Sequence, residues 1–417
     1  MEIKRDIYLE KLIKRRDNGL VKVITGVRRS GKSYLLFRIF RSYLIGEGVS
    51  AEQIIEVALD DIANKELRKS DALYEHVKRR VKGNALHYVF LDEIQFVDGF
   101  YDVINGLMRI KNLDIYVTGS NSKLLSSDIL TEFRGRGDEV RVYPLCFSEY
   151  VSSYKGSTNQ AWKDYYTFGG MPIILSREED DLKADYLSNL FKEVYLRDIC
   201  ERNNIRHEDD FDAVVDILAS SIGALTNPSK LQRSFRSVRR SAITDKTIKS
   251  YIDYLEDAFL IQAVQRYDVK GKKYIETPLK YYFVDVGLRN ARLNFRQQEE
   301  NHIMENVIYN ELRVRGYSVD IGIVDTTETN TAGRRQQKRL EVDFIARRGN
   351  DQTYIQSAFS VAGEDKETQE IRSLNKISDS FRKYIIIRDD IKTKRDENGI
   401  VTMGLFDFLL NPDSLSK

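Results

Sequence analysis

The stretch GVRRSGKS, residues 26–33, lies between an apolar run, Val21–Thr25, and a segment of helical period, Tyr34–Leu44. Its glycines let the backbone turn tightly, so that N–H groups point inward without clashes from Cβ atoms. A helix that begins directly after the turn adds unpaired N–H groups and the positive end of its dipole. This order of strand, glycine-rich turn and helix is the context in which the pattern GxxxxGK[ST] binds phosphate. The stretch therefore predicts a phosphate-binding loop.

The side chains of this loop predict its ligand. Lys32 is expected to reach the β- and γ-phosphates of a nucleoside triphosphate, and the hydroxyl of Ser33 is expected to ligate Mg²⁺. The predicted ligand is ATP with Mg²⁺, and the predicted nucleotide-binding residues are Gly26, Val27, Arg28, Arg29, Ser30, Gly31, Lys32, Ser33 and Tyr34. The alternative is a chance match in a turn rich in glycine and serine, which the flanking strand and helix make the weaker interpretation.

A second element, YVFLDE at residues 88–93, ends an apolar run with two carboxylates. In open α/β sheets ligands bind at the carboxyl ends of the strands, where these side chains are expected to lie. Asp92 is predicted to hold Mg²⁺, and Glu93 to act as the general base that activates the attacking water. Acidic residues after a strand are common by themselves. A pair that follows a phosphate-binding loop indicates hydrolysis as well as binding.

A third strand-like run, Ile115–Thr118, is followed by the small polar residues Gly119, Ser120 and Asn121. Side chains of this kind can hydrogen-bond a phosphate oxygen or a water molecule. Ser120 is therefore predicted to sense the γ-phosphate or to position the water, and a plain Gly-Ser turn is the alternative.

The segment FRGRG, residues 133–137, contains two arginines. An arginine here is predicted to stabilise charge on the transferring phosphoryl group, with Arg136 preferred over Arg134. In a homo-oligomer this arginine would act on the site of a neighbouring subunit. The alternative is a solvated basic loop.

The composition sets broad limits. The chain has 417 residues, of which 41% are hydrophobic and 31% charged, and this is typical of roughly two to four globular domains. A net charge of +2 gives no general argument for nucleic acid, so any such case rests on local clusters. Cys146 and Cys200 are far apart and the histidines show no metal-ligand spacing, which argues against a disulfide scaffold or a zinc site. Without a signal-like N-terminus or a long apolar run, the expected location is the cytoplasm.

Changes of pattern divide the chain into three predicted domains. Residues 1–150 alternate short apolar runs with helical segments, as a parallel α/β nucleotide-binding core does. Residues 151–265 are mostly of helical period and end in a predicted β-hairpin, which favours a helical lid followed by a winged helix-turn-helix. Residues 266–417 return to mixed helices and strands and predict a further α/β domain with its own sheet. The strands expected in the core are Leu20–Thr25, Ile54–Leu59, Tyr88–Leu91, Ile115–Thr118 and Val140–Val142.

Taken together, these motifs resemble an AAA-type P-loop ATPase family of bacteria and archaea. The resemblance covers nearly the whole chain and rests on an ordered series: GVRRSGKS at 26–33, FLDEIQ at 90–95, TGSNS at 118–122, FRGRG at 133–137, PLCFSEY at 144–150, GGMP at 169–172 and YFVDVGLRN at 282–290. The family implies an ATPase core of five parallel strands, a helical lid, a winged helix and a C-terminal domain of unknown function related to restriction-endonuclease-like folds. It also implies for Lys32, Ser33, Asp92 and Glu93 the roles given above.

The nuclease relationship can be tested on the residues themselves. Nucleases of that fold hold Mg²⁺ with an Asp on one strand and a Glu-x-Lys on the next, and a Glu on the preceding helix often helps. Here Glu305 lies on a predicted helix and Asp343 on a predicted strand, but Gln356 stands in the place of the Glu and Ala358 in the place of the Lys. An amide has no charge to offer a metal. We therefore expect a nuclease-like fold with weak or no nuclease activity, and catalysis by a substitute lysine is the open alternative.

Two basic segments are candidates for contact with DNA. Residues 227–240, NPSKLQRSFRSVRR, contain five basic residues and no acidic one, and residues 334–339, RRQQKR, form a second cluster. Local clusters of this kind make phosphate contacts. The helix expected from Thr244, which would be the recognition helix, mixes lysines with several acidic residues and suits a major groove poorly. A solvated basic face, or a winged helix that binds a protein, is the alternative.

The function predicted from these features is Mg²⁺-dependent ATP hydrolysis that drives or switches the conformation of the winged-helix and C-terminal domains. One alternative is a slowly hydrolysing, nucleotide-gated switch that binds a protein partner. The other alternative is an ATP-coupled enzyme that processes DNA. No membrane contact is expected.

Overall fold

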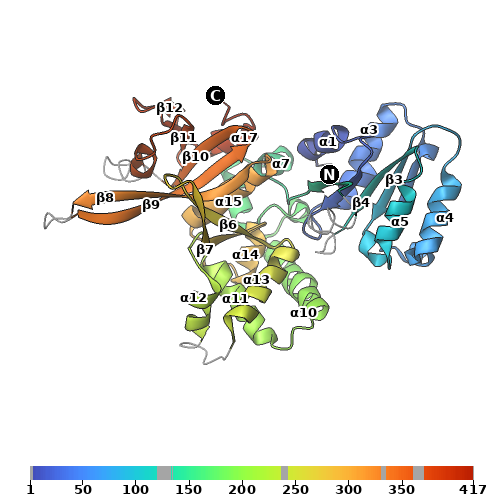
Figure 1. Ribbon diagram of the computed structural model, residues 1–417, viewed down its shortest axis with the longest axis horizontal. Coiled ribbons are helices and arrows are strands. Elements are labelled where there is room, and N and C mark those ends of the chain that lie inside the picture. The colour runs from blue at the N-terminus through green and yellow to red at the C-terminus, as the bar shows by residue number, and fades with distance from the viewer. Residues whose placement is uncertain are drawn as a thin grey trace. The chain divides into compact units, whose positions relative to one another are not determined.

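The computed structural model describes residues 3–119, 133, 135–235, 243–329, 335–359 and 371–416. Ser120, Asn121, Arg134 and Arg334, to which the sequence drew attention, lie outside the described residues, as do residues 236–240. The chain divides into two compact units. The first unit holds Met1–Pro144 with Asp257–Phe259, and the second holds Leu145–Glu256 with Leu260–Lys417. Figure 1 labels their helices and strands.

The first unit is built on a five-stranded parallel sheet with the order β2-β3-β4-β1-β5. Its strands are β1 Val21–Thr25, β2 Ile54–Ala58, β3 His87–Asp92, β4 Leu113–Thr118 and β5 Gly137–Arg141. Its helices are α1 Asp6–Ile13, α2 Lys32–Tyr34, α3 Arg41–Gly46, α4 Ser70–Arg80 and α5 Phe100–Leu107, with a π-helical segment Leu35–Phe40 between α2 and α3. The predicted five-stranded parallel core is therefore confirmed.

Helices cover both faces of this sheet, because alternate side chains of each buried strand point to opposite faces. On one face Val21 and Val23 of β1 share a core with Leu73 of α4 and Ile104 of α5. On the other face Ile24 packs with residues of α1 and of the helix that follows the GVRRSGKS loop. In α5 the buried residues Phe100, Val103, Ile104 and Leu107 follow the spacing of one helical face.

The second unit contains a mixed eight-stranded sheet with the order β12-β13-β11-β10-β9-β8-β6-β7. Its strands are β6 Ile261–Asp268, β7 Lys273–Phe283, β8 Ser318–Thr329, β9 Arg335–Arg348, β10 Asp351–Ala358, β11 Arg382–Ile387, β12 Lys394–Arg395 and β13 Val401–Gly404. Its helices are α7 Phe147–Ser153, α8 Thr158–Phe168, α9 Asp180–Asn189, α10 Arg197–Asn203, α11 Glu208–Ser220, α12 Pro228–Ser234, α13 Asp245–Asp257, α14 Val286–Arg292, α15 Glu300–Val314 and α17 Leu405–Leu410. The hairpin expected at the end of a winged helix is β6–β7, and it continues into this sheet, because β6 pairs in parallel with β8.

Two of the motifs in the ordered series meet in a tight joint between α8 and α14. A Cβ atom on Gly287 would lie 2.0 Å from the carbonyl oxygen of Phe168, and one on Gly170 would lie 2.1 Å from that of Leu145. The carboxylate of Asp285 accepts hydrogen bonds from the backbone N–H of Leu288 at 2.9 Å and of Gly170 at 2.8 Å. The motifs GGMP and YFVDVGLRN therefore hold helices together, and glycine is required because backbone meets backbone.

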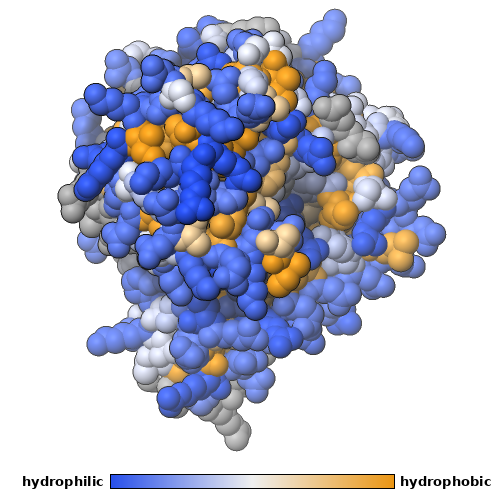
Figure 2. Space-filling model, turned by 90° about the vertical axis from the view of Figure 1, so that its right-hand side faces the viewer, coloured by the Kyte–Doolittle hydropathy of each residue, from blue (hydrophilic) through white to orange (hydrophobic). Residues whose placement is uncertain are grey.

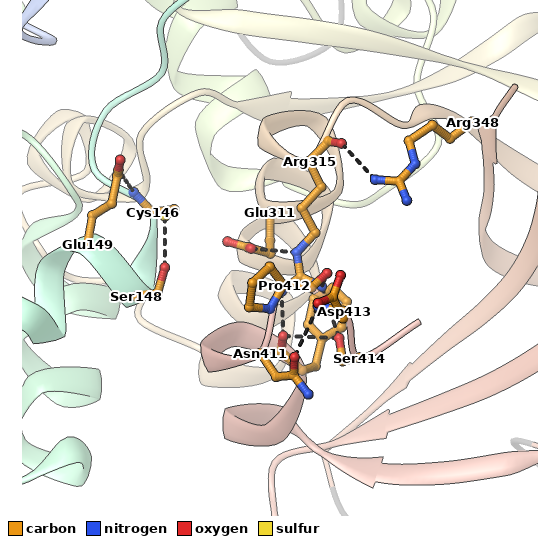
Figure 3. Close-up of polar contacts among 11 residues, drawn as sticks. Cys146, Ser148, Glu149, Glu311, Arg315, Arg348, Asn411, Pro412, Asp413 and Ser414 are labelled. Atoms are coloured by element: carbon orange, nitrogen blue, oxygen red, sulfur yellow. Dashed lines mark hydrogen bonds and ion pairs between the residues drawn. The ribbon is translucent and has the colours of Figure 1, made fainter. Parts of the chain in front are cut away.

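A second joint attaches the C-terminal helix to α15 (Figure 3). Arg315 pairs with Glu311 at 2.6 Å and also donates to the hydroxyl of Ser414 at 2.9 Å and to the carbonyl of Phe408. Cys146, which Figure 3 also shows, is buried, and its thiol lies 3.2 Å from the hydroxyl of Ser148. Burial and the nearby carboxylates of Glu149 and Glu311 raise the pKa of this thiol well above its usual value, so it stays protonated and unreactive.

The surface shows no large apolar area on the face drawn in Figure 2, where hydrophobic side chains form small groups among hydrophilic ones. Scattered exposure of this kind is normal for a folded domain. Among the described residues, every helix is too short or too polar to span a bilayer.

Candidate nucleotide site

The GVRRSGKS loop leaves β1 and enters α2 through two glycines with positive φ. Gly26 has φ +136°, and a Cβ atom there would lie 2.1 Å from the carbonyl oxygen of Val142. Gly31 has φ +95° and directly precedes the first helical residue, Lys32. Any L side chain would clash at the first position and be strained at the second. The sequence predicted this turn correctly because its requirement is local.

Lys32 is a buried cation whose hydrogen bonds, among the residues that the structure describes, go to backbone oxygens. Its side chain is 4% exposed, and its ammonium group donates to the carbonyl oxygens of Gly26 at 2.9 Å and Val27 at 3.0 Å. Burial lowers its pKa to about 8, although the carboxylates of Glu93 and Asp92 act in the opposite direction. A buried ammonium charge that nearby groups balance so weakly is stabilised when an anion binds beside it.

Ser33, Asp92 and Thr118 form a hydrogen-bonded chain at the carboxyl edge of the sheet. The hydroxyl of Ser33 donates to Asp92 Oδ1 at 3.0 Å, and the hydroxyl of Thr118 donates to the same oxygen. Burial raises the pKa of Asp92, and these two hydrogen bonds oppose the rise. Thr118 reaches Asp92 because β4, which it ends, lies beside β3 and between β3 and β1 in the sheet.

Thr118 also orients the residue after Asp92. The backbone N–H of Glu93 donates to Thr118 Oγ1 at 3.0 Å, and Glu93 has a positive φ of +52°. The side chain of Gln95 donates to the Glu93 carboxylate. The strained backbone and the two hydrogen bonds hold Glu93 at the sheet edge that carries the loop. Sequence reasoning missed Thr118 and Gln95 as site residues, although both stand in quoted motifs.

Arg136 lies at the other edge of the sheet. Its carbonyl accepts from the N–H of Val21, the first residue of β1, at 2.9 Å, and β5 begins directly after it. The GVRRSGKS loop follows the last residue of β1, so the length of the strand separates the loop from Arg136. Arg136 is exposed. The role on the site of a neighbouring subunit therefore stays a prediction, and so does the alternative of a solvated basic loop.

The residues at the loop fit a nucleotide with its metal. The hydroxyl of Ser33 and the carboxylate of Asp92 are oxygen donors of the type that Mg²⁺ prefers. The hydroxyl of Ser30 is fully buried and has no hydrogen-bond partner among the described residues. A buried polar atom of this kind usually indicates a missing partner.

Comparisons with known proteins agree with this geometry. The AAA domain family matches residues 18–151, and a family described as a domain of unknown function (DUF8612) matches residues 159–299. An uncharacterized protein of Haemophilus influenzae is 34% identical over 414 residues, which cover 98% of this chain and 98% of that protein. The chain belongs to the AAA-type P-loop ATPase family.

Other proteins are similar to this chain at lower sequence identity. The uncharacterized protein MJ1544 of Methanocaldococcus jannaschii is 29% identical over 390 residues, which cover 90% of this chain and 81% of that protein. Among solved structures, Cdc6p from Pyrobaculum aerophilum matches 73% of this chain and 97% of its own at 10% identity, with a TM-score of 0.29. A likeness of that size carries no argument about function.

In the second unit of this AAA-type chain, Glu305, Asp343 and Gln356, which were considered for a nuclease site, lie close together. Lys280 lies among them. Lys280 of β7 is 4% exposed, and its ammonium group contacts Glu305 at 3.0 Å and Glu341 at 2.6 Å. Burial alone would lower the pKa of Lys280, but the carboxylates of Glu305, Asp343 and Glu341 outweigh it and raise this pKa above its usual value.

The other polar groups of this cluster are also bound to protein. Asp343 accepts a hydrogen bond from the backbone N–H of Ser357 at 2.8 Å, and the amide oxygen of Gln356 faces the N–H of Asp343 at 3.4 Å. Burial raises the pKa of Asp343 well above its usual value, as does Glu305, while Lys280 acts in the opposite direction. Among the described residues, no group of acidic, histidine or cysteine side chains is arranged to hold a metal ion. The cluster does not fit a catalytic metal, because its cation is already provided by Lys280.

The two basic segments have different surroundings. In the first segment, residues 228–234 form α12, and Lys230 donates to the carbonyl of Leu225 at 3.1 Å. On α13, the helix that would read bases, the exposed Lys249 pairs with Asp253 at 2.7 Å. In the second segment, residues 335–339 begin the long strand β9. In this segment the described residues 335–339 are all exposed and form a continuous polar strand.

Proposed function

We propose that this chain hydrolyses ATP at the GVRRSGKS loop with Mg²⁺, and that the nucleotide bound there switches the conformation of its second unit. The observation that carries the proposal is the meeting of Lys32, Ser33, Asp92 and Glu93 at one edge of the parallel sheet. The hydrogen bonds Ser33–Asp92 and Thr118–Asp92 link the loop to the acidic pair. Membership of an AAA-type P-loop family supports the same assignment.

The loop residues are proposed to bind the triphosphate. The backbone N–H groups of residues 26–33 would surround the phosphates, and Lys32 would leave the carbonyls of Gly26 and Val27 to pair with phosphate oxygens. Its lowered pKa favours this exchange, because the free ammonium group is poorly compensated. Ser33 and Asp92 would hold Mg²⁺, which supplies positive charge against the charge of the phosphates.

Glu93 is proposed to accept the proton of the attacking water. Its backbone N–H bond to Thr118 and its side-chain bond to Gln95 restrict where the carboxylate points. A base that is held in place before the reaction avoids the cost of reorganisation in the transition state.

The test is the substitution Glu93→Gln, which keeps the shape of the side chain and removes the base. Hydrolysis should fall by roughly 10²- to 10⁴-fold, while binding of a fluorescent ATP analogue stays within about twofold. Glu56→Gln, on β2 of the same sheet, is the matched control and should leave hydrolysis unchanged. If Glu93→Gln hydrolysed ATP at an undiminished rate, the assignment of Glu93 as the base would be wrong.

Arg136 is proposed to complete the site of a neighbouring subunit in a homo-oligomer. Its exposure and its position at the opposite sheet edge support a role in trans over one in its own chain. Arg136→Ala should lower hydrolysis by roughly 10³-fold and leave ATP binding unchanged. A mixture of Arg136→Ala and Lys32→Ala chains should recover activity, because each variant supplies what the other lacks. A mixture as inactive as its components would contradict the proposal.

The slowly hydrolysing switch is a second candidate, and one observation favours it. The acidic residues of α13 and its Lys249–Asp253 ion pair suit a protein-binding helix better than one that reads bases. Single-turnover and steady-state rates distinguish the two: a switch releases its nucleotide slowly and turns over less than about once per minute.

The second unit is proposed to lack metal-dependent nuclease activity. Gln356 and Ala358 replace the expected Glu and Lys, and Lys280 occupies the centre of the acidic cluster. Supercoiled plasmid incubated with the protein and Mg²⁺ or Mn²⁺ should remain uncut. Cleavage that disappears in Asp343→Asn would overturn the proposal.

A further inference from the structure

Strands β8 and β9 extend beyond the rest of the eight-stranded sheet as a two-stranded ribbon (Figure 1). The last register pair of β6 with β8 is Asp268 with Ile323, and the pairing of β10 with β9 reaches only to Phe344. Five further pairs, from Asp325 with Arg339 to Thr329 with Arg335, have no neighbouring strand on either side within the described residues. We name residues 325–329 and 335–339 the arm. Five residues of extended strand make the arm about 17 Å long.

The arm contains no apolar residue on either face. Its two strands read DTTET and RQQKR. A two-stranded ribbon without an apolar face has little to hold it in water. An edge strand also presents unpaired backbone groups, which proteins often protect with charged side chains. The arm has more charge than the protection of an edge strand needs, because it is long, carries charged residues on both faces and is rich in side chains that donate hydrogen bonds.

The fold places a second basic segment at the base of the arm. The turn between β6 and β7 contains KGKK, residues 270–273. The N–H of Val269 donates to the carbonyl of Ile323 at 2.9 Å, and the ammonium group of Lys270 donates to the carbonyl of Asp325 at 2.9 Å. Lys272 and Lys273 are exposed. Two segments far apart in the sequence therefore form one surface.

This surface is far more basic than the chain as a whole. The arm and the turn carry six basic residues against two acidic ones, Asp325 and Glu328, in a chain with a net charge of only +2. Asp325 is paired with Arg339 at 2.9 Å, and both side chains are half-exposed, so the pair is weak and easily exchanged. Asp268, beside the turn, is buried and accepts the N–H of Gly271 at 2.8 Å.

We propose that the arm and the KGKK turn bind double-stranded DNA, with the arm in the major groove and the lysines of the turn on the phosphates. A two-stranded β-ribbon fits the width of the major groove. Arginine and glutamine, which make up four of the five arm residues on β9, are the side chains that pair with the edges of guanine and adenine. Single strands are bound on aromatic platforms, which the arm lacks. A protein partner would call for apolar anchors, which the arm also lacks.

The test measures binding of the full chain, without nucleotide, to a labelled duplex of roughly 20 base pairs between about 50 and 200 mM salt. The double variant Lys272→Gln/Lys273→Gln should weaken binding roughly tenfold and lower the slope of log affinity against log salt by about 2. Arg335→Gln/Arg339→Gln should weaken binding by a similar factor. The control Lys65→Gln/Lys111→Gln changes the net charge equally at exposed lysines of the first unit and should have no effect.

The inference does not depend on ATP hydrolysis, and Lys32→Ala should bind the duplex as tightly as the original chain. Thermal unfolding of each variant verifies that the fold is intact. Absence of binding at low salt, equal losses in the test and control variants, or tighter binding of a single strand of the same length would each overturn the proposal. Duplex binding that weakens only in the arm and turn variants would support it.

Discussion

Lys32 in the first unit and Lys280 in the second are equally buried, at 4% exposed each, yet their surroundings differ completely. Lys32 donates to two backbone carbonyls, and burial lowers its pKa to about 8. Lys280 contacts the carboxylates of Glu305 and Glu341, and these with Asp343 raise its pKa despite burial. At Lys32 burial outweighs the nearby carboxylates of Glu93 and Asp92, whereas at Lys280 the carboxylates outweigh burial.

The difference distinguishes the proposed nucleotide site around Lys32 from the structural cluster around Lys280. A buried charge without a counter-charge costs free energy, and a protein keeps it where a ligand will supply the missing charge. A buried charge with several partners costs little while the set is complete and much when one member is removed. Lys32 is therefore expected to matter for ligand binding, and Lys280 for stability.

The largest expected effect is the loss of stability in Lys280→Met. Removing the cation leaves buried carboxylates uncompensated, which should lower the free energy of unfolding of the second unit by about 3–5 kcal/mol. Urea unfolding with hydrogen exchange of β7 and β9 measures this loss. The control Lys249→Met breaks an exposed pair on α13 and should cost less than about 1 kcal/mol.

The loss in Lys280→Met should also depend on pH. Without Lys280 the carboxylate of Asp343, whose pKa burial already raises, has a folded-state pKa further above its unfolded value. Protonation then stabilises the fold, so the variant should lose stability as the pH rises from about 5 to 8. An equal loss of stability at pH 5 and pH 8 would contradict the explanation that buried, uncompensated carboxylates cause the loss.

The second effect is loss of ATP binding in Lys32→Met with little change in stability. A hydrogen bond from an ammonium group to phosphate contributes about 1.5–3 kcal/mol, so affinity should fall roughly 10- to 100-fold. The free energy of unfolding should stay constant or rise, because a desolvated charge is removed. Titration with a fluorescent ATP analogue and urea unfolding test the two halves. If Lys32→Met lost as much stability as Lys280→Met, the proposed difference between the two lysines would be wrong.

The third effect is a decline of ATP affinity above the pKa of Lys32. The free protein holds Lys32 with a pKa of about 8, and bound phosphate favours the protonated form. Binding therefore takes up a proton above that pH, and affinity should be constant below pH 8 and fall up to tenfold per pH unit above it. Calorimetric titration at several pH values measures the profile. A flat profile up to pH 9.5 would contradict the assigned role of Lys32.

The smallest effect is expected from Thr118→Val at the loop. This change removes the hydroxyl that donates to Asp92 and accepts from Glu93, at a cost of about 1 kcal/mol or roughly fivefold in turnover. It also removes a hydrogen bond that lowers the pKa of Asp92, so the acidic limb of the rate profile should move to higher pH. Thr118→Ser keeps the hydroxyl and should behave as the original chain does. A profile that stays in place would make Thr118 a packing residue.

The strands of the first unit could be predicted from the sequence because their signal is local. β1 and β3 are short runs that are buried throughout, and four of the five predicted runs have both bounds within two residues of an observed strand, as Ile115–Thr118 does against β4 Leu113–Thr118. The fifth, Val140–Val142, starts three residues after β5 Gly137–Arg141 begins, because the first residues of β5 are polar. The hairpin from Ile261 was also predicted, but its membership in the eight-stranded sheet was not. The hairpin joins the sheet because β6 pairs with β8. Such a pairing between distant segments cannot be predicted from the local sequence pattern.

The sequence by itself predicted the GVRRSGKS turn, the place of the acidic pair at a strand end and the family, because glycine spacing and strand ends are properties of neighbouring residues. Only the tertiary structure decided which other residues join them. Strand order brings Thr118 and Ser33 to the same oxygen of Asp92 and puts Arg136 at the far edge of the sheet. Sheet pairing likewise brings Lys280 to Glu305 and the KGKK turn to the arm. These contacts join residues distant in the chain, and their free energies depend on burial and charge that exist only after the strands have paired.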